Sequence, residues 1–173
     1  MWPSSSRRFI LFSLCLGLIF LLPCCGREKE SSFPLAPDFT LKTLDGREIT
    51  LSALRGEVIL LDFWATWCSP CRESIPHLIR LYKTYQKKGV EVIGINMDKR
   101  DMETVRQFAM SMEIPYPVVV SLEKVEKDYG VTSLPSAIII DKRGRIRGKY
   151  RGFTSEIATQ MTTTVQELLS ENP

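Results

Sequence analysis

Histidine and cysteine are scarce in most of this chain, which limits the metal chemistry that it can carry. Its 173 residues include five cysteines and a single histidine, His77. Three of the cysteines lie within the first 26 residues, which leaves Cys68 and Cys71 for the remainder. A structural zinc site needs further ligands and a disulfide scaffold needs several spaced pairs. We therefore expect no metal site and no cofactor other than this cysteine pair, with His77 as a surface residue.

An excess of charge of one sign is also missing. The net charge is +3, and Arg7 and Arg8 supply two of these charges. No basic stripe interleaved with aromatic residues is present, which argues against nucleic acid as a partner. With 44% hydrophobic and 25% charged residues, the composition is that of one ordinary globular domain.

The first 26 residues have the build of an export signal. Arg7 and Arg8 precede an apolar run at 9–22, which is shorter than the roughly 20 residues that usually span a bilayer. The cysteines that close this run resemble a bacterial lipoprotein signal. Three outcomes stay open: lipidation at Cys24 or Cys25, an uncleaved membrane anchor, or a cleaved signal.

Each outcome places the rest of the chain outside the cytoplasm. We therefore predict a signal peptide or membrane/lipid anchor at 1–26, a polar tether at 27–33 and a folded domain at 34–173. The membrane is a partner through the N-terminal anchor.

The folded part alternates strand-like and helix-like patterns. Residues 36–41 and 47–51 flank an Asp-Gly pair and predict a β-hairpin. A continuous apolar run from residue 58 predicts a strand buried on both faces. The later patterns predict, in order, a helix at 72–88, a strand at 90–97, a helix at 101–112, a strand at 118–120, a short helix at 122–129, strands at 136–140 and 146–150, and a helix to about 170. This order predicts an α/β fold, a mixed central sheet flanked by helices with an N-terminal β-hairpin and a central αβ insert.

Cys68 and Cys71 form a Cys-x-x-Cys pair where the buried strand ends and a helix begins. Unpaired N–H groups at a helix N-terminus stabilise a thiolate, so this position lowers a thiol pKa. We predict a redox-active pair, with Cys68 as the more exposed nucleophile and Cys71 as the resolving thiol. Pro70 fits the first turn, which needs no N–H from it. A static disulfide or two idle thiols are the alternatives.

Asp62 interrupts the apolar strand that leads to this pair. An isolated buried carboxylate is costly unless it is neutral or paired. Asp62 is therefore either an acid of raised pKa that exchanges a proton with a nearby thiol, or a strand-edge residue paired with Lys or Arg.

Several of these features together resemble a known family. Residues 67–71, the strand before them and the Leu-Pro pair at 134–135 resemble the thioredoxin fold. The segment at 36–41, the hairpin turn at 45–46 and the insert at 97–120 look like the TlpA/ResA branch. This branch contains membrane-tethered thiol–disulfide oxidoreductases of the bacterial cell envelope.

The resemblance implies an activity and its partners. The substrate is a protein thiol or disulfide, and family members usually keep other thiols reduced, including the haem-binding cysteines of apocytochromes c. A membrane electron donor then reduces the pair again. An oxidant of this fold usually carries a His between the cysteines, where this chain has Ser69 and Pro70.

The resemblance also implies a substrate site. Pro135 matches the family's cis-proline, beside which the backbone of Leu134 is offered to a substrate strand. Trp67 and Pro70 complete the predicted substrate-binding residues, and Trp64 and Trp67 are both expected to lie half in the core and half at the rim of the site.

The position of the acidic residue near the cysteines differs between this chain and the TlpA/ResA branch. Asp62 matches the buried acid of thioredoxin itself, whereas the TlpA/ResA branch commonly has a Glu at the position of Ser74. We expect Asp62 to take over the acid role.

Two other functions remain as alternatives. A peroxiredoxin-like thiol peroxidase shares the segment at 36–41 but requires Pro and Thr or Ser where this chain has Leu61 and Ala65. A copper chaperone of the same fold, which is not an enzyme, requires Cys-x-x-x-Cys and a distant His.

Overall fold

The computed structural model describes residues 33–99 and 101–171. The predicted signal or anchor and the lipidation sites at Cys24 and Cys25 lie outside these residues, as does the tether apart from Phe33. Across the described ranges, no helix is both long and apolar enough to cross a membrane.

A five-stranded mixed sheet forms the centre of the domain, with the strand order β5-β4-β3-β6-β7. β3 is parallel to β4 and β4 to β5, whereas β6 is antiparallel to both β3 and β7. The strands are β3 (Val58–Trp64), β4 (Val90–Asn96), β5 (Val118–Val120), β6 (Ser136–Ile140) and β7 (Ile146–Arg151). The predicted run from residue 58 is thus the central strand, and its seven residues are all buried.

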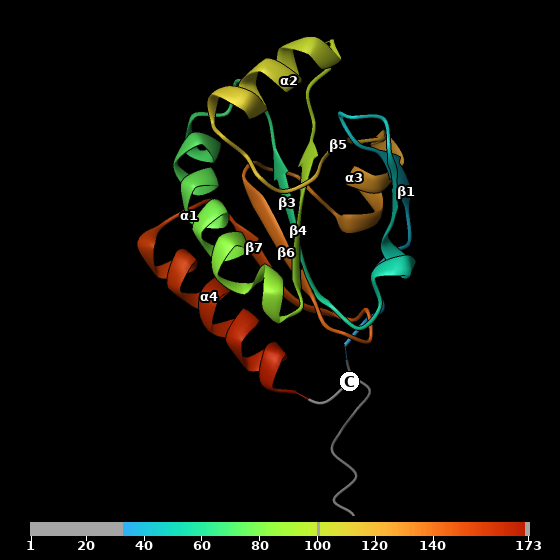
Figure 1. Cartoon of the computed structure of the whole chain (residues 1–173), viewed down its shortest axis with the longest axis vertical. Coiled ribbons are helices and arrows are strands. Elements are labelled where there is room, and N and C mark those ends of the chain that lie inside the picture. Colours follow the sequence, from blue (N-terminus) through green and yellow to red (C-terminus); the bar gives the residue numbers. More distant parts are fainter. Residues whose placement is uncertain (1–32, 100, 172–173) are drawn as a thin grey trace, which may run out of the picture. The chain divides into compact units, whose positions relative to one another are not determined.

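Helices cover both faces of the sheet, as predicted. Figure 1 shows α1 and α4 on one side and α3 with the hairpin on the other. The helices are α1 (Ser69–Tyr85), α2 (Met102–Ser111), α3 (Glu123–Tyr129) and α4 (Ser155–Ser170), with short 3-10 turns at Leu51–Leu54 and Gln86–Lys88. The hairpin strands β1 (Thr40–Lys42) and β2 (Glu48–Thr50) form a separate two-stranded sheet around Gly46, whose φ is 88°.

Local sequence signals fix most helix ends. Asp101 caps α2 by accepting a hydrogen bond from the Thr104 amide at 2.9 Å, and Thr154 caps α4. Gly130 ends α3 in the left-handed conformation. The exception is α1, which begins at Ser69 rather than at residue 72, because a proline is pre-organised for the first turn of a helix.

Alternate residues of β3 pack into different parts of the core. Ile59, Leu61 and Phe63 contact the cluster formed with the hairpin and α3. Leu60 and Trp64 point to the opposite face, toward α1, α2 and α4. Since side chains alternate along a strand, Asp62 lies on the α1 face, between Leu60 and Trp64.

Candidate active site

Cys68 and Cys71 form a disulfide at the start of α1, with their Cα atoms 5.3 Å apart. Cys68 is the N-cap of this helix, and its Sγ accepts a hydrogen bond from the Cys71 amide at 3.2 Å. Cys68 is 4% exposed and Cys71 is fully buried, so the predicted order of exposure is confirmed by a small margin. A thiolate released at Cys68 would lie at the positive end of the helix dipole.

The loop before Cys68 is held by a carboxylate that the sequence reasoning missed. Asp98 accepts hydrogen bonds from the Thr66 amide at 2.7 Å, from its hydroxyl at 2.9 Å and from the Asn96 side chain at 2.7 Å. One signal could have revealed this cluster. Thr66 and Asp98 follow the carboxyl ends of β3 and β4, and neighbouring parallel strands end at the same edge of a sheet.

A second contact to this loop comes from α1. The Arg72 guanidinium donates a hydrogen bond to the Thr66 carbonyl at 2.9 Å and lies 4.8 Å from the centre of the Phe108 ring. Phe108 in turn stacks on Trp64, with ring centres 5.1 Å apart. Trp64 is fully buried, so the expectation that half of it lies at the rim is wrong. Its position on the central strand, beneath α1 and α2, places it in the core.

Asp62 lies in the central strand and is 1% exposed. The strand-edge alternative is therefore wrong, and no ion pair to Asp62 occurs within the described residues. Burial raises the pKa of Asp62 to about 7, because the charged form loses its hydration. Ser74 is also buried and donates its hydroxyl to the Cys71 carbonyl, so α1 contributes no acid at that position.

A groove of about 520 Å³ lies beside the disulfide. Trp67, which is 64% exposed, and Leu134 line it, and Leu134 also packs against the cluster that contains both cysteines. The peptide between Leu134 and Pro135 is cis, as predicted. Pro135 is buried, and Pro70 is exposed in the first turn of α1, so neither lines the groove. Its other lining residues are Met97, Asp98, Lys99, Glu126, Val131, Thr132 and Ser133.

The described ranges contain no group of three or more His, Cys, Asp or Glu residues placed to hold a metal ion. His77 is half-buried, with its ring centre 5.9 Å from that of Phe153. Burial lowers the pKa of His77. His77, which was expected at the surface, is thus only partly exposed, and no described residue is placed to bind a metal ion together with it.

Comparisons with known proteins agree with this geometry. A profile of the AhpC/TSA family matches residues 35–149. The thiol-disulfide oxidoreductase ResA of Bacillus thuringiensis subsp. konkukian is 34% identical over 150 residues, which are 84% of this chain and 86% of the relative. ResA of Geobacillus thermodenitrificans is 40% identical over 113 residues, 65% of this chain and 64% of the relative.

A solved structure has the same fold. The crystal structure of a thiol:disulfide interchange protein of the thioredoxin family from Chlorobium tepidum matches with a TM-score of 0.73. It is 26% identical, and the match covers 82% of this chain and 99% of that one.

The Asp98 cluster predicts a large effect on stability. Replacing Asp98 with Asn removes a charged acceptor from buried donors, which we expect to lower the free energy of unfolding by about 1–3 kcal/mol in urea denaturation. Glu126→Gln is the matched control, because Glu126 lines the same groove and its carboxylate makes no hydrogen bond within the described residues. We expect that change to stay within about 0.5 kcal/mol. Equal effects of the two changes would contradict the role of Asp98.

Asp62 predicts a pH-dependent stability. The unfolded carboxyl ionises near its ordinary pKa, 3.8, whereas the folded one ionises at about 7. Between these values only the unfolded state has lost the proton, so the stability present below about pH 4 is lost as the pH rises to about 7. Relative to Asp62→Asn, the wild-type protein should lose about 3–5 kcal/mol over this range and then level off.

The measurement is urea denaturation of both proteins from pH 4 to 8. Asp45→Asn is the control, because hydrogen bonds from Thr43 and Arg47 lower the pKa of this exposed carboxyl. The stability that Asp45 contributes is lost only as the pH falls, so its replacement should not reproduce the decline. Parallel stability curves for wild type and Asp62→Asn would contradict the raised pKa.

Proposed function

This chain belongs to the AhpC/TSA family and is a thiol–disulfide oxidoreductase, and from that premise we propose that it reduces protein disulfides outside the cytoplasm. The observation that carries the proposal is the Cys68 sulfur. It caps α1 and accepts a hydrogen bond from the amide of Cys71, and the preceding residue, Trp67, lines the groove.

The proposed reaction starts from the dithiol form. The Cys68 thiolate attacks one sulfur of a substrate disulfide, forms a mixed disulfide and releases the other substrate sulfur as a thiolate. Cys71 then passes its proton to the Asp62 carboxylate and attacks the Cys68 sulfur. This second step releases the remaining substrate sulfur and leaves the Cys68–Cys71 disulfide. Two electrons have passed to the substrate, and a membrane electron donor returns them.

The groove supplies a place for the substrate chain. Trp67 offers an exposed aromatic surface, and Leu134 forms the wall nearest the cysteines. Within residues 33–99 and 101–171, no hydrogen bond uses the main-chain N–H or C=O of Leu134. These groups are therefore available to hydrogen-bond an extended substrate strand. Pro135 fixes the conformation of the backbone that carries them. Pro70 covers the first turn of α1 beside the attacking sulfur.

The proposed location rests on the N-terminal sequence, and the proposed direction rests on the two residues between the cysteines. The proposed N-terminal signal or anchor delivers the domain to the outer face of a membrane and tethers it there, with Cys24 or Cys25 as a lipid attachment point. Ser69 and Pro70 between the cysteines favour a reductant over an oxidant. The haem-binding cysteines of apocytochromes c are the substrates that the ResA resemblance suggests.

The peroxidase alternative receives less support at the site. Leu61 and Ala65 occupy the positions where it would need Pro and a hydroxyl, and both side chains are fully buried and apolar. Cys71 is also bonded to Cys68, as a dithiol mechanism requires. A copper chaperone would need metal ligands that the described residues do not bring together.

Trapping tests the division of labour between the cysteines. With insulin as a disulfide substrate, Cys71→Ser should accumulate a mixed disulfide through Cys68, because the resolving thiol is missing. Cys68→Ser should form no such adduct. The adduct is detected by non-reducing electrophoresis and peptide mass spectrometry, in chains with Cys15, Cys24 and Cys25 replaced by serine. An adduct through Cys71 in the Cys68→Ser chain would reverse the assignment.

The reduction potential tests the proposed direction. We expect a value near that of thioredoxin, about −270 mV, and well below that of the oxidant DsbA, about −120 mV. The protein is equilibrated in dithiothreitol buffers, and the alkylated Cys68–Cys71 peptide is quantified by mass spectrometry. Cys71→Ser serves as the control without a transition. A potential near −120 mV would identify an oxidant instead.

A further inference from the structure

Three buried polar atoms around one glycine have no hydrogen-bond partner among the described residues. They are Oδ2 of Asp62, Nε1 of Trp64 and the hydroxyl of Tyr116. Buried polar groups in folded proteins nearly always have a partner, from the protein or from ordered water. Three such atoms in one region are therefore candidates for a shared partner, and we call the place that they border the polar chamber.

The strand register explains why these atoms meet at this point. Asp62 pairs with Gly94 of β4 on one side and with Ala137 of β6 on the other, so neither neighbouring strand fills the space beside its carboxyl. A Cβ on Gly94 would lie 3.0 Å from Nε1 of Trp64 and 3.2 Å from Cε2 of Tyr116. Cε2 is one bond from the carbon that bears the hydroxyl.

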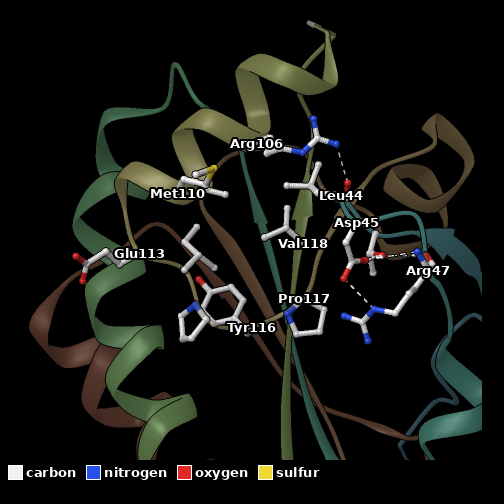
Figure 2. Close-up of a pocket in the computed structure, with 13 residues that line it drawn as sticks. Leu44, Asp45, Arg47, Arg106, Met110, Glu113, Tyr116, Pro117 and Val118 are labelled. Carbon is white, nitrogen blue, oxygen red and sulfur yellow. Dashed lines mark hydrogen bonds and ion pairs between the residues drawn. The ribbon is translucent and has the colours of Figure 1, made fainter.

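Tyr116 separates this chamber from a second groove. Its ring packs edge-on against Tyr82 of α1, with centres 5.9 Å apart, and only 3% of the residue is exposed. It also lines a groove of about 380 Å³ between α2 and the hairpin turn, where Figure 2 draws it beside Pro117. Tyr116 thus borders open space while its hydroxyl stays buried.

The surroundings of Asp62 leave Tyr116 as its main polar neighbour. β4 and β6 contribute only Gly94 and Ala137 opposite it. Burial and, after it, the nearby Asp62 carboxylate raise the pKa of Tyr116. α1 contributes Cys71 on the same face and, further along, the half-buried His77. Among the charged residues of the helices packed on this face, Arg106 of α2 is bonded to Glu103 and to the Leu44 carbonyl. The others are exposed: Arg72, Glu73, Arg80 and Lys83 on α1, Glu103 on α2, and Glu156 and Glu167 on α4.

We propose that Asp62, Trp64 and Tyr116 enclose ordered water, and that Tyr116 is the positioning residue for the water that exchanges the proton of Asp62. This inference rests on the proposed function of Asp62 as the proton acceptor of Cys71. Nε1 of Trp64 can only donate a hydrogen bond, so the water accepts from it and keeps a hydrogen to donate to the carboxylate.

The proton balance is simple. Cys71 loses its proton to the Asp62 carboxylate and attacks Cys68 as a thiolate. Protonated Asp62 then releases this proton through the water beside Tyr116 to bulk solvent, which returns Asp62 to the ionised form. Because the tyrosine hydroxyl can donate to the water that solvates the carboxylate, its removal disfavours the ionised acid.

The test is Tyr116→Phe, which removes only the hydroxyl and keeps the ring. In full-length protein with Cys15, Cys24 and Cys25 replaced by serine, the reduced form is mixed with 5,5′-dithiobis(2-nitrobenzoate). Stopped-flow absorbance from pH 5 to 9 then separates attack by Cys68 from the second release by Cys71. We expect the midpoint of the second step to rise by about 0.5–1 pH unit, and its rate at pH 7 to fall about two- to fivefold. The first step should be unchanged.

Two further variants make the result specific. Tyr82→Phe is the matched control, because the Tyr82 ring packs against that of Tyr116. The charges that influence the Tyr82 hydroxyl are those of Glu91 and Glu57, not that of Asp62. The pH midpoint of the second step should therefore not change in this variant. In an Asp62→Asn background, Tyr116→Phe should add no further change. Thermal unfolding of each variant checks that the fold is intact.

The outcomes distinguish the role of Tyr116 from that of Asp62. If Asp62→Asn slows the second step but Tyr116→Phe leaves its midpoint in place, the role of Tyr116 is overturned and that of Asp62 stands. A Tyr116→Phe effect that persists in the Asp62→Asn background likewise overturns it. If Asp62→Asn leaves the second step unchanged, the proton acceptor itself has been assigned wrongly and the inference fails with it.

Discussion

The hydrogen bond from the Cys71 amide to the Cys68 sulfur is the interaction that the surrounding structure maintains. It exists because α1 begins directly after Cys68, so that the helix offers an unpaired N–H to the sulfur. The loop before Cys68 is fixed on two sides, by Asp98 through Thr66 and by Arg72 through the Thr66 carbonyl. These contacts hold the sulfur at the end of the helix.

The second constraint is a carboxyl group in the central strand. The core of a small domain rarely accommodates an unpaired acid, because burial costs several kcal/mol unless the group stays neutral. Here the cost is expressed as a pKa raised to about 7, and the neighbouring strands place only Gly94 and Ala137 beside the carboxyl. Asp62 can therefore change its protonation state near neutral pH, where a carboxyl in water would be fully ionised.

Local patterns in the sequence were sufficient for most of the fold and for the two cysteines. Apolar runs, the Asp-Gly turn and the caps at Asp101 and Thr154 act over a few residues, so the strands and helices they predict are confirmed. The missed features depend on pairs that are distant in sequence. Thr66 meets Asp98 across two parallel strands, and Tyr116 reaches the strand of Asp62 only because Gly94 leaves space for it. Trp64 was misplaced for the same reason, since α2 covers it from more than 40 residues away.

The two grooves have no lining residue in common. Leu134 precedes β6 on one side of β3, whereas Tyr116 precedes β5 on the other. In the proposed mechanism the substrate docks over Trp67 and Leu134, whereas the proton of Asp62 leaves past Tyr116. If both proposals hold, a bound substrate would not block the path by which the buried acid regains its charge.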